Sequence, residues 1–519
     1  MLRNRTSALK VLALSLLALV LAAGPVPAQE AKPAPDRALL DAAQSIDGRV
    51  LYHYVRELAS DKYAGRLTGT PEYDRAAEWV ASLLKSWGVE PAGDNGTYFQ
   101  SFPNPYTLVL PGFELSLYIP VGGPKAKAEV RKYYRFDDEF MPGGTSSSGE
   151  VTAEVVYVGY GISAPELGYD DYAGVDVKGK IVLMEREVPV EPGPNPDVFK
   201  KWRPYSFHQY KLETAAAKGA KGLLYNYGPI ANPNNSYREG FVYSHVGDVV
   251  VGDVFAGTGR DHAQVVAKIE KTLKPQSFAT GKVVTIKNFT EHHPEGIGKS
   301  VLGVIRGSDP VLKDEVIIMG GHLDHCGRYG ETTLPGANDN GAAVAAMLGQ
   351  AEAMMKAKVK PKRTVLFAFF GAEEQAVHGS EYYSQHPVFP LDKTMAVINL
   401  EAVGSGNRWH VMAGKNFPGL YRFFDDADQR YLHREISGST FANIARPRQD
   451  VTWFLWKGVP GVTLGAYGGV ESSKPTYHNT GDNMSLIQAP ILEDSARLLF
   501  LAVEGMAQAP SIDFRVKGN

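Results

Sequence analysis

The chain has 519 residues, of which 44% are hydrophobic and 21% are charged, and its formal net charge is −3. This is ordinary globular composition, which excludes wholesale disorder, and the length exceeds that of one compact domain. The small net charge excludes the electrostatic footprint of a nucleic-acid-binding protein, so the function must be sought in a site.

The N-terminus has the pattern of a secretory signal peptide over residues 1–28. Three basic residues precede a short apolar run, Val11–Ala23, and small residues then lead to Ala28. The run is too short for a comfortable membrane span, and no later apolar stretch reaches spanning length. We expect an exported chain, periplasmic or secreted, with no membrane attachment after signal removal; a retained anchor is the alternative. Cys326 is the only cysteine, so no intrachain disulfide can form.

A Pro/Ala-rich linker over residues 29–45 separates the signal from the first segments that have helical spacing. Leu51–Leu58 and Tyr73–Trp87 are predicted helices, and Pro71 suits the first turn of the second one. We assign residues 46–138 to the first part of the main domain.

The middle of the chain has a different pattern. From Leu108 to about Lys287, short β-type runs are separated by Gly, Pro and Asp clusters, with one helix-like run at Tyr210–Lys218. This pattern predicts a separate, mostly β module, which we assign to residues 139–275.

Beyond the inserted module, strand-like apolar runs alternate with longer helical ones. Glu315–Met319, Thr364–Phe370 and Met395–Leu400 are nearly continuous apolar runs, typical of parallel strands buried on both faces. Gly341–Met355 suits a crossover helix between the first two strands. We therefore predict that residues 276–519 complete a three-layer α/β domain with a mixed, mainly parallel sheet.

Each of these three strands ends in a residue that can bind a metal ion. The first runs into His322, the second into Glu373 and Glu374, and the third into Glu401. Because the carboxyl ends of parallel strands share one edge of the sheet, where open α/β sheets bind ligands, we expect these side chains to converge.

Two further residues join the candidate site. Asp339 precedes the predicted crossover helix, where it could serve as an ordinary helix N-cap or bridge two cations with one oxygen for each. His478 follows the apolar run Val459–Leu464 in a polar loop, and considered alone it would be a surface histidine.

Five short motifs make the C-terminal half, and more weakly the N-terminal helices, resemble the co-catalytic zinc aminopeptidases of family M28. In order they are Gly-Gly-His322-Leu-Asp324-His, Gly-Ala-Asn-Asp339-Asn-Gly, Gly-Ala-Glu373-Glu374, Asn399-Leu-Glu401 and His478-Asn-Thr-Gly-Asp482. Any one motif is weak, but the ordered set is specific. The resemblance implies a zinc-peptidase/phosphorylase-like fold for the main domain.

The inserted module resembles the protease-associated (PA) domain that often interrupts such peptidases. The similar segments are Val156–Ile162, Asp171-Tyr172, Val177–Val182 and Ala217–Gly222. This resemblance bears on the fold and says almost nothing about a ligand.

Carried over by position, the M28 resemblance implies two zinc ions per chain. His322 and Glu401 would hold one ion, Glu374 and His478 the other, and Asp339 would bridge them. Imidazole and carboxylate ligands suit zinc, and two ions sharing a water would lower its pKa and polarise the scissile carbonyl.

The same resemblance implies roles for neighbouring residues. Glu373 is similar to the general base of the family, which takes a proton from the water and passes it to the leaving amine. Asp324 would fix the tautomer of His322, and Asp482 would do the same for His478. Glu401 departs from the commoner aspartate but is a competent ligand. The family pattern does not use His325 or Cys326, so we expect supporting or packing roles for them.

The leading prediction is therefore an exported zinc exopeptidase, an aminopeptidase that acts on peptide substrates without a nucleic-acid partner. Carboxypeptidase or dipeptidase activity is left open, because Arg446 or Arg448 could clamp a substrate carboxylate. Acyl transfer of the single-zinc glutaminyl cyclase type is a second possible activity of this fold, and a non-catalytic binding protein is a third possibility. The oligomeric state is not predicted.

Overall fold

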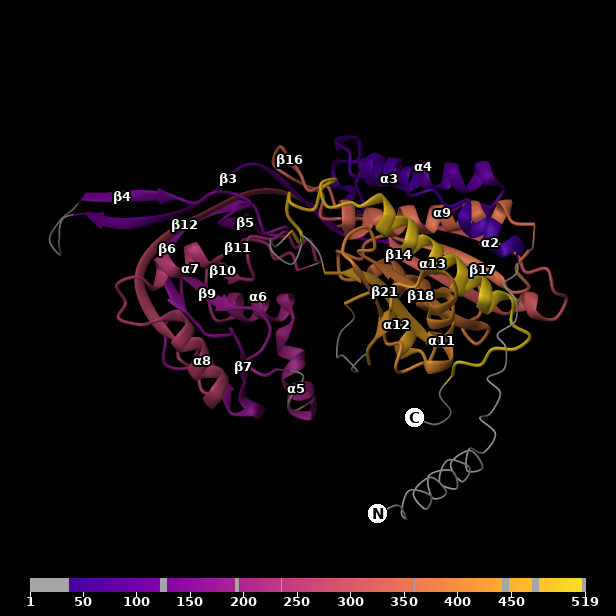
Figure 1. The fold of residues 1–519 in the computed structure, drawn as a ribbon. Helices are drawn as coiled ribbons and strands as arrows, with labels where there is room; N and C mark the ends of the chain where they lie inside the picture. The colour runs from indigo at the N-terminus through magenta and orange to yellow at the C-terminus, as the bar shows by residue number, and fades with distance from the viewer. Residues whose placement is uncertain are drawn as a thin grey trace, which may run out of the picture.

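The computed structural model describes residues 37–121, 128–191, 196–234, 236–358, 360–440, 448–468 and 476–515. The expected signal peptide and residues 29–36 of the linker lie outside these residues. Within the described part of the chain, no helix is both long and apolar enough to cross a membrane. Figure 1 shows two bodies, an α/β body formed by both ends of the chain and a second, largely β body formed by its middle.

The α/β body is built on a nine-stranded mixed sheet. Its spatial order is β1-β13-β17-β14-β18-β21-β19-β20, with β2 also paired to β13. The central pairs from β17 to β21 are parallel, whereas β13 and β19 add to them in the antiparallel sense. The strands are β1 (Glu90–Pro91), β2 (Phe99–Pro103), β13 (Ile297–Ile305), β14 (Val316–His322), β17 (Thr364–Phe370), β18 (Thr394–Glu401), β19 (Arg408–Met412), β20 (Ser437–Gly438) and β21 (Gly461–Tyr467).

Helices cover both faces of this sheet, as the continuous apolar runs predicted. Ile317 and Met319 of β14 belong to one buried cluster, and Val316 and Ile318 belong to another. Because side chains alternate along a strand, the two clusters lie on opposite faces of the sheet. The predicted three-layer α/β fold is thereby confirmed.

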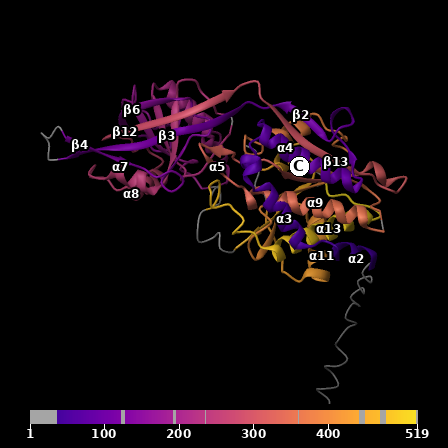
Figure 2. The same cartoon turned by 90° about the horizontal axis from the view of Figure 1, so that it is seen from above.

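The larger of the two clusters lies under six helices. Figure 2, seen from above, shows α3, α9 and α13 side by side, and these three helices are in mutual contact. The helices on this face are α2 (Arg37–Gln44), α3 (Gly48–Leu58), α4 (Pro71–Trp87), α9 (Ala343–Lys356), α11 (Pro418–Ala427) and α13 (Ala489–Gln508). The other face carries α10 (His378–Gln385) and α12 (Val451–Trp456).

The second body contains a ten-stranded sheet and four helices. Its order is β16-β15-β3-β12-β6-β9-β10-β11-β5, with β4 paired to β3. The strands are β3 (Tyr106–Val121), β4 (Ala128–Tyr133), β5 (Phe140–Pro142), β6 (Gly149–Tyr157), β9 (Ile181–Glu185), β10 (Gly222–Asn226), β11 (Val242–Val246), β12 (Phe278–His293), β15 (Arg328–Tyr329) and β16 (Thr332–Thr333). The remaining elements are the pair β7 (Ser163–Ala164) and β8 (Tyr169–Asp170), with α5 (Pro196–Trp202), α6 (His208–Ala217), α7 (Asp248–Phe255) and α8 (His262–Thr272).

This sheet extends beyond the predicted module at both ends. The assignment to residues 139–275 omits all of β3 and β12, the two long strands that run between the bodies in Figure 1. The short strands β15 and β16 come from the chain just after His322 and join the same sheet, where Tyr329 pairs with Val109. The inserted body is thus fastened close to the expected metal ligands.

Candidate metal centre

The five expected ligands meet at the carboxyl edge of the central strands. His322 is the last residue of β14, Glu401 is the last residue of β18, and Glu374 follows β17. Asp339 lies in the irregular turn before α9, and His478 lies in the loop after β21. The structure brings all five side chains together.

Asp339 lies between the two histidines. Its Oδ1 is 3.3 Å from Nε2 of His322, and its Oδ2 is 3.2 Å from Nε2 of His478. Each imidazole also faces a second acid, since His322 Nε2 is 3.1 Å from Glu401 Oε1 and His478 Nε2 is 3.0 Å from Glu374 Oε2. The donors form two pockets that share Asp339. The first pocket comprises His322, Glu401 and Asp339, and the second comprises His478, Glu374 and Asp339.

The donor set fits zinc. Nitrogen and oxygen donors of His322, Asp339 and Glu374 all lie within 4.8 Å of one another, so the two pockets adjoin at Asp339. Imidazole nitrogens with carboxylate oxygens are typical zinc ligands, and three protein ligands per ion leave a position open for water or substrate. A cation in each pocket would replace the close contacts between imidazole nitrogen and carboxylate oxygen.

The electrostatics of the pockets reflect burial and an excess of acids. Burial lowers the pKa of His322. The charge of Glu401 and the contact with Asp339 have a larger, opposite effect, so the pKa lies well above its usual value. In His478 burial again opposes the charged form, and Cys326 and Glu374 raise the pKa well above its usual value. Metal binding requires neutral imidazoles, so an ion entering these pockets releases their protons.

Asp324 supports both sides of the site. Its two carboxylate oxygens accept the backbone N–H groups of Glu373 and Glu374, each at 3.2 Å. Nδ1 of His322 lies 3.1 Å from the Asp324 backbone oxygen and 3.7 Å from its carboxylate. The imidazole is therefore held mainly by the carbonyl of Asp324, while the carboxylate fixes the turn that carries the two glutamates.

The expectation for Asp482 is wrong. Its carboxylate accepts the backbone N–H groups of Asn338 at 2.8 Å and Asp339 at 2.9 Å. Nδ1 of His478 lies instead 2.9 Å from the backbone oxygen of Ala231, in the inserted body. Asp482 therefore fixes the turn that presents Asp339, because two backbone N–H groups of that turn donate to its carboxylate.

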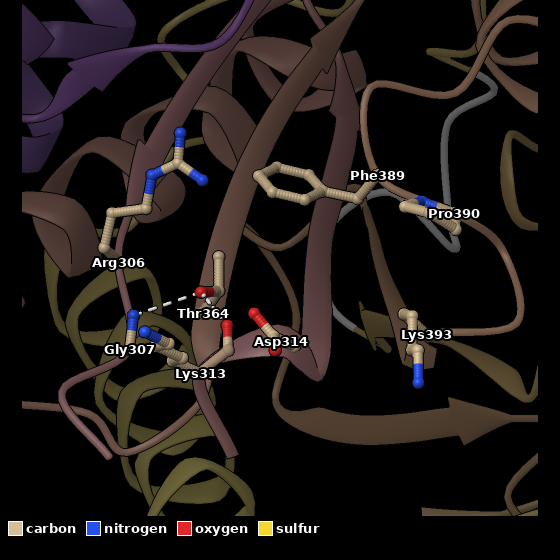
Figure 3. Close-up of a pocket in the computed structure, with 8 residues that line it drawn as sticks. All are labelled: Arg306, Gly307, Lys313, Asp314, Thr364, Phe389, Pro390 and Lys393. Atoms are coloured by element: carbon tan, nitrogen blue, oxygen red, sulfur yellow. Dashed lines mark hydrogen bonds between the residues drawn. The ribbon is translucent and has the colours of Figure 1, made fainter. Parts of the chain in front are cut away.

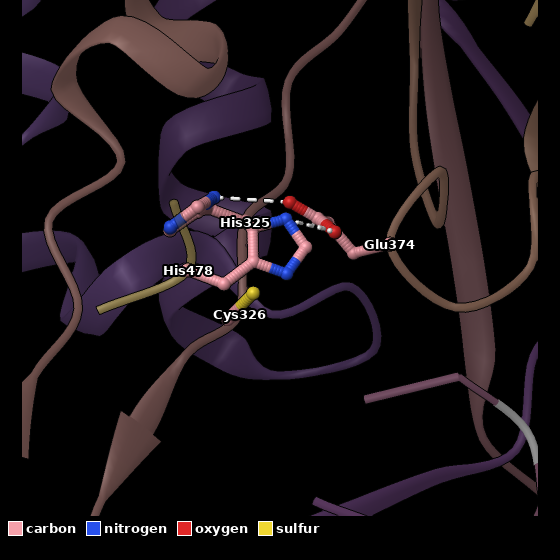
Figure 4. A group of neighbouring side chains, drawn as sticks. All are labelled: His325, Cys326, Glu374 and His478. Carbon is pink, nitrogen blue, oxygen red and sulfur yellow. Dashed lines mark hydrogen bonds and ion pairs between the residues drawn. The ribbon is translucent and has the colours of Figure 1, made fainter. Parts of the chain in front are cut away.

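His325 and Cys326 lie beside the second pocket (Figure 4). Nδ1 of His325 is 3.0 Å from Oε1 of Glu374, and both side chains are buried. The Cys326 thiol lies within 4.8 Å of donor atoms of His325, Glu374 and His478. Burial raises the pKa of this thiol, so it is protonated when no ion is near. The contact with His325 orients Glu374, and Cys326 lies beside both residues.

Arg66 is a buried residue of the site region that the sequence did not single out. Its guanidinium donates to the backbone oxygens of Leu58 at 2.7 Å, and of Leu323, Pro335 and Gly336 at 2.8 Å each. It thereby ties the segment after His322 to the segment before Asp339. Residues 61–70, between the two predicted N-terminal helices, are mostly polar or glycine, and nothing in this sequence indicates burial of Arg66.

A separate hollow of about 520 Å³ lies at the opposite edge of the sheet (Figure 3). Its floor includes Thr364, the first residue of β17, whose hydroxyl accepts the Gly307 N–H at 3.1 Å. Arg306, Lys313 and Lys393 also line it, and none of the expected site residues does. The acid- and histidine-lined site therefore lies at the other end of the strands.

Comparison with known proteins agrees with the arrangement of the two bodies. Residues 300–503 match the model of peptidase family M28, and residues 151–259 match that of the PA domain. An aminopeptidase of Pseudomonas aeruginosa is 26% identical over 363 residues, which cover 68% of this chain and 56% of that protein. The chain thus spans about half the length of this relative.

Solved structures share the fold. The aminopeptidase from Aneurinibacillus sp. strain AM-1 superposes with a TM-score of 0.62 at 20% identity, covering 92% of this chain and 98% of that one. The zinc aminopeptidase from Bacillus subtilis superposes with a TM-score of 0.56 at 17% identity, covering 91% and 97%. The α/β body with its metal-ligand edge, the family match and these folds agree: residues 300–503 form a peptidase family M28 domain, and residues 151–259 form a PA domain inserted before it.

Proposed function

We propose that this protein is a zinc-dependent aminopeptidase that releases N-terminal residues from peptides. The observation that carries the proposal is the position of Asp339, whose two oxygens face His322 and His478 at 3.3 and 3.2 Å. A carboxylate in this position can bridge two cations. We also propose export after removal of residues 1–28, which N-terminal sequencing of the mature protein tests.

The chain's own residues divide the work of hydrolysis. Zinc ions held in the two pockets would supply a water of lowered pKa and polarise the substrate carbonyl. Glu373 takes the proton of the attacking water and delivers it to the leaving amine. Burial raises the pKa of Glu373 well above that of an ordinary carboxyl, which helps it both accept and release a proton. Asp324 keeps Glu373 in place through the backbone N–H.

The surroundings favour an amine over a carboxylate as the recognised end of the substrate. Arg448, a candidate carboxylate clamp, forms an ion pair with Glu187 of the inserted body. Glu187 is also 2.6 Å from Arg203, so Arg448 is held in an ion-pair cluster of the inserted body. Arg446 lies outside the described residues. Glu373, an acid beside the pockets, would attract a substrate ammonium group.

A panel of aminoacyl reporter substrates tests the proposal. Hydrolysis should stop on chelation and return with zinc. Glu373→Gln should keep its zinc but lose about 10²–10⁴-fold in kcat, because it removes the proton acceptor. Glu352→Gln, which alters a glutamate of α9 that pairs with Lys356, is the matched control and should leave hydrolysis unchanged.

Three outcomes would contradict the proposal. Hydrolysis that survives complete removal of metal would exclude the metal-dependent reaction. Unchanged turnover in Glu373→Gln would exclude this residue as the base. Cleavage confined to peptides with a blocked N-terminus and a free C-terminus would identify a carboxypeptidase instead.

A further inference from the structure

The inserted PA domain reaches the second pocket through the loop over residues 227–234, which follows β10. The Ala231 oxygen lies 2.9 Å from Nδ1 of His478, and the Ala231 N–H donates to the His478 oxygen at 2.8 Å. Because a carbonyl can only accept, Nδ1 of His478 carries the proton. In the neutral, metal-binding ring Nε2 is therefore the nitrogen with the lone pair, and it is the one that faces Asp339 and Glu374.

A second contact fastens the same segment. Thr480 donates its backbone N–H to Oδ1 of Asp137 at 3.3 Å, and its hydroxyl donates to the other oxygen of that carboxylate. Asp137 lies between β4 and β5, two strands of the ten-stranded sheet. The loop that presents His478 is thus held at two points by the inserted body.

The 227–234 loop is itself supported by buried histidines. Nδ1 of His245 on β11 lies 2.8 Å from the backbone oxygen of Ile230, next to Ala231. Nε2 of His245 is 3.4 Å from Nε2 of His208, whose Nδ1 is 2.9 Å from the Ser236 hydroxyl. Burial lowers the pKa of His245 to about 4, so its ring is neutral at neutral pH and Nδ1–H donates to the Ile230 carbonyl.

The two pockets differ in what surrounds them. Nδ1 of His322 in the first pocket is held by the Asp324 backbone oxygen, from the same strand end. Nδ1 of His478 in the second pocket is held by the inserted domain. Ala231 also packs in a small apolar cluster with Cys326 and Tyr329, which follow His322 in the chain.

We propose that the inserted PA domain is a positioning element of the metal centre. The Ala231 carbonyl fixes the tautomer and direction of His478, so zinc affinity in the second pocket depends on the docking of the 227–234 loop. The first pocket does not share this dependence. By linkage, an ion in the second pocket in turn stabilises the docked loop. The inference rests on the two-zinc assignment of the proposed function and is independent of the peptide substrate.

Zinc titration of the purified full chain against a competing chromogenic chelator tests the inference. His245→Leu removes the donor that holds Ile230, whereas His245→Asn keeps an amide N–H near the position of Nδ1. His262→Leu, in α8 of the same domain, is the matched control, because its partner is Glu185. We expect His245→Leu to weaken one of two zinc sites about 10–100-fold and leave the other unchanged. His245→Asn and His262→Leu should bind two zinc ions as the wild type does.

Each other result has a defined meaning. Unchanged affinities in His245→Leu, or equal loss at both sites, would overturn the inference. Fewer than two zinc ions in the wild type would instead contradict the proposed function.

If His245→Leu does not fold, hydrogen exchange of the wild type decides the question. Removing zinc should speed exchange in peptides covering residues 227–234 and 476–482, and should leave α8 unchanged. Exchange at 227–234 that does not respond to zinc would overturn the inference.

Discussion

At the residue scale, the geometry of Asp339 decides between two roles of an aspartate, that of a helix N-cap and that of a metal ligand. Its place before α9 would suit a helix N-cap, yet α9 has no side-chain cap. The carboxylate is directed at His322 and His478 instead. The turn that presents it is held from outside by Asp482, so the side chain is free to face the pockets.

Asp339→Asn tests the bridging position. The amide keeps the size of the side chain but removes its charge and one of its two acceptor oxygens. We expect zinc affinity to fall at both sites, by more than about 100-fold, since loss of a direct ligand should exceed the effect of a supporting residue. Competition with a chelator measures the zinc affinity of both sites. Asp261→Asn, at the distant N-cap of α8, is the control. Loss of a single zinc ion would mean that Asp339 binds only one metal.

Residues differ in how well the sequence alone could place them. His322, Glu374 and Glu401 were accessible because each directly follows a strand whose apolar run is visible. His478 had no such geometric signal and depended on the family motif. Ala231 was not accessible at all, because it acts through a backbone oxygen, and its partner lies 247 positions away in sequence.

Secondary-structure elements were predictable where the sequence has an uninterrupted apolar run or a helical spacing with a start signal. The apolar runs of β14, β17 and β18 were identified to within a few residues, because both faces of these strands are buried. Helix α4 begins at Pro71 and ends at Trp87, as its start signal and spacing predicted. Strand β19, which lies between β21 and β20, was missed, because only alternate residues of it are buried and no continuous apolar run results.

Arg66 acts at the scale of elements, because its guanidinium joins the end of α3 to two segments around the site. Arg66→Met would leave these carbonyls without a donor and remove a buried cation that faces Asp482 and Asp324. We expect a loss of about 3–5 kcal/mol in the free energy of unfolding, measured with denaturant on metal-free protein. Arg56→Met on the exposed face of α3 should change it by less than about 0.5 kcal/mol. A loss below about 1 kcal/mol in Arg66→Met would show that water or neighbouring groups replace the guanidinium.

At the scale of the whole molecule, the junction between the two bodies was the least predictable feature. The change of pattern at Leu108 falls within β3, but the module boundaries were placed inside the true sheet. In β3 the exposed residues Leu110, Pro111 and Gly112 interrupt the buried positions, and residues 119–121 are exposed again, so the sequence resembles short separate runs and not one long strand. The contribution of β15 and β16 from the other half of the chain depends on tertiary pairing that the sequence does not reveal.

The stability of the whole molecule should depend on pH through His245. Its pKa is about 4 in the folded protein, against 6.5 for an ordinary histidine, because burial disfavours the charged ring. Between these values the unfolded chain binds more protons, so stability is complete above pH 6.5 and falls as the pH decreases towards 4. The expected loss is about 3 kcal/mol. Denaturant unfolding of metal-free wild type and His245→Asn at pH 7, 5.5 and 4.5 isolates this contribution, because asparagine does not titrate and the other groups are shared. Equal pH dependence in the two proteins would show that the folded protein accommodates a charged His245.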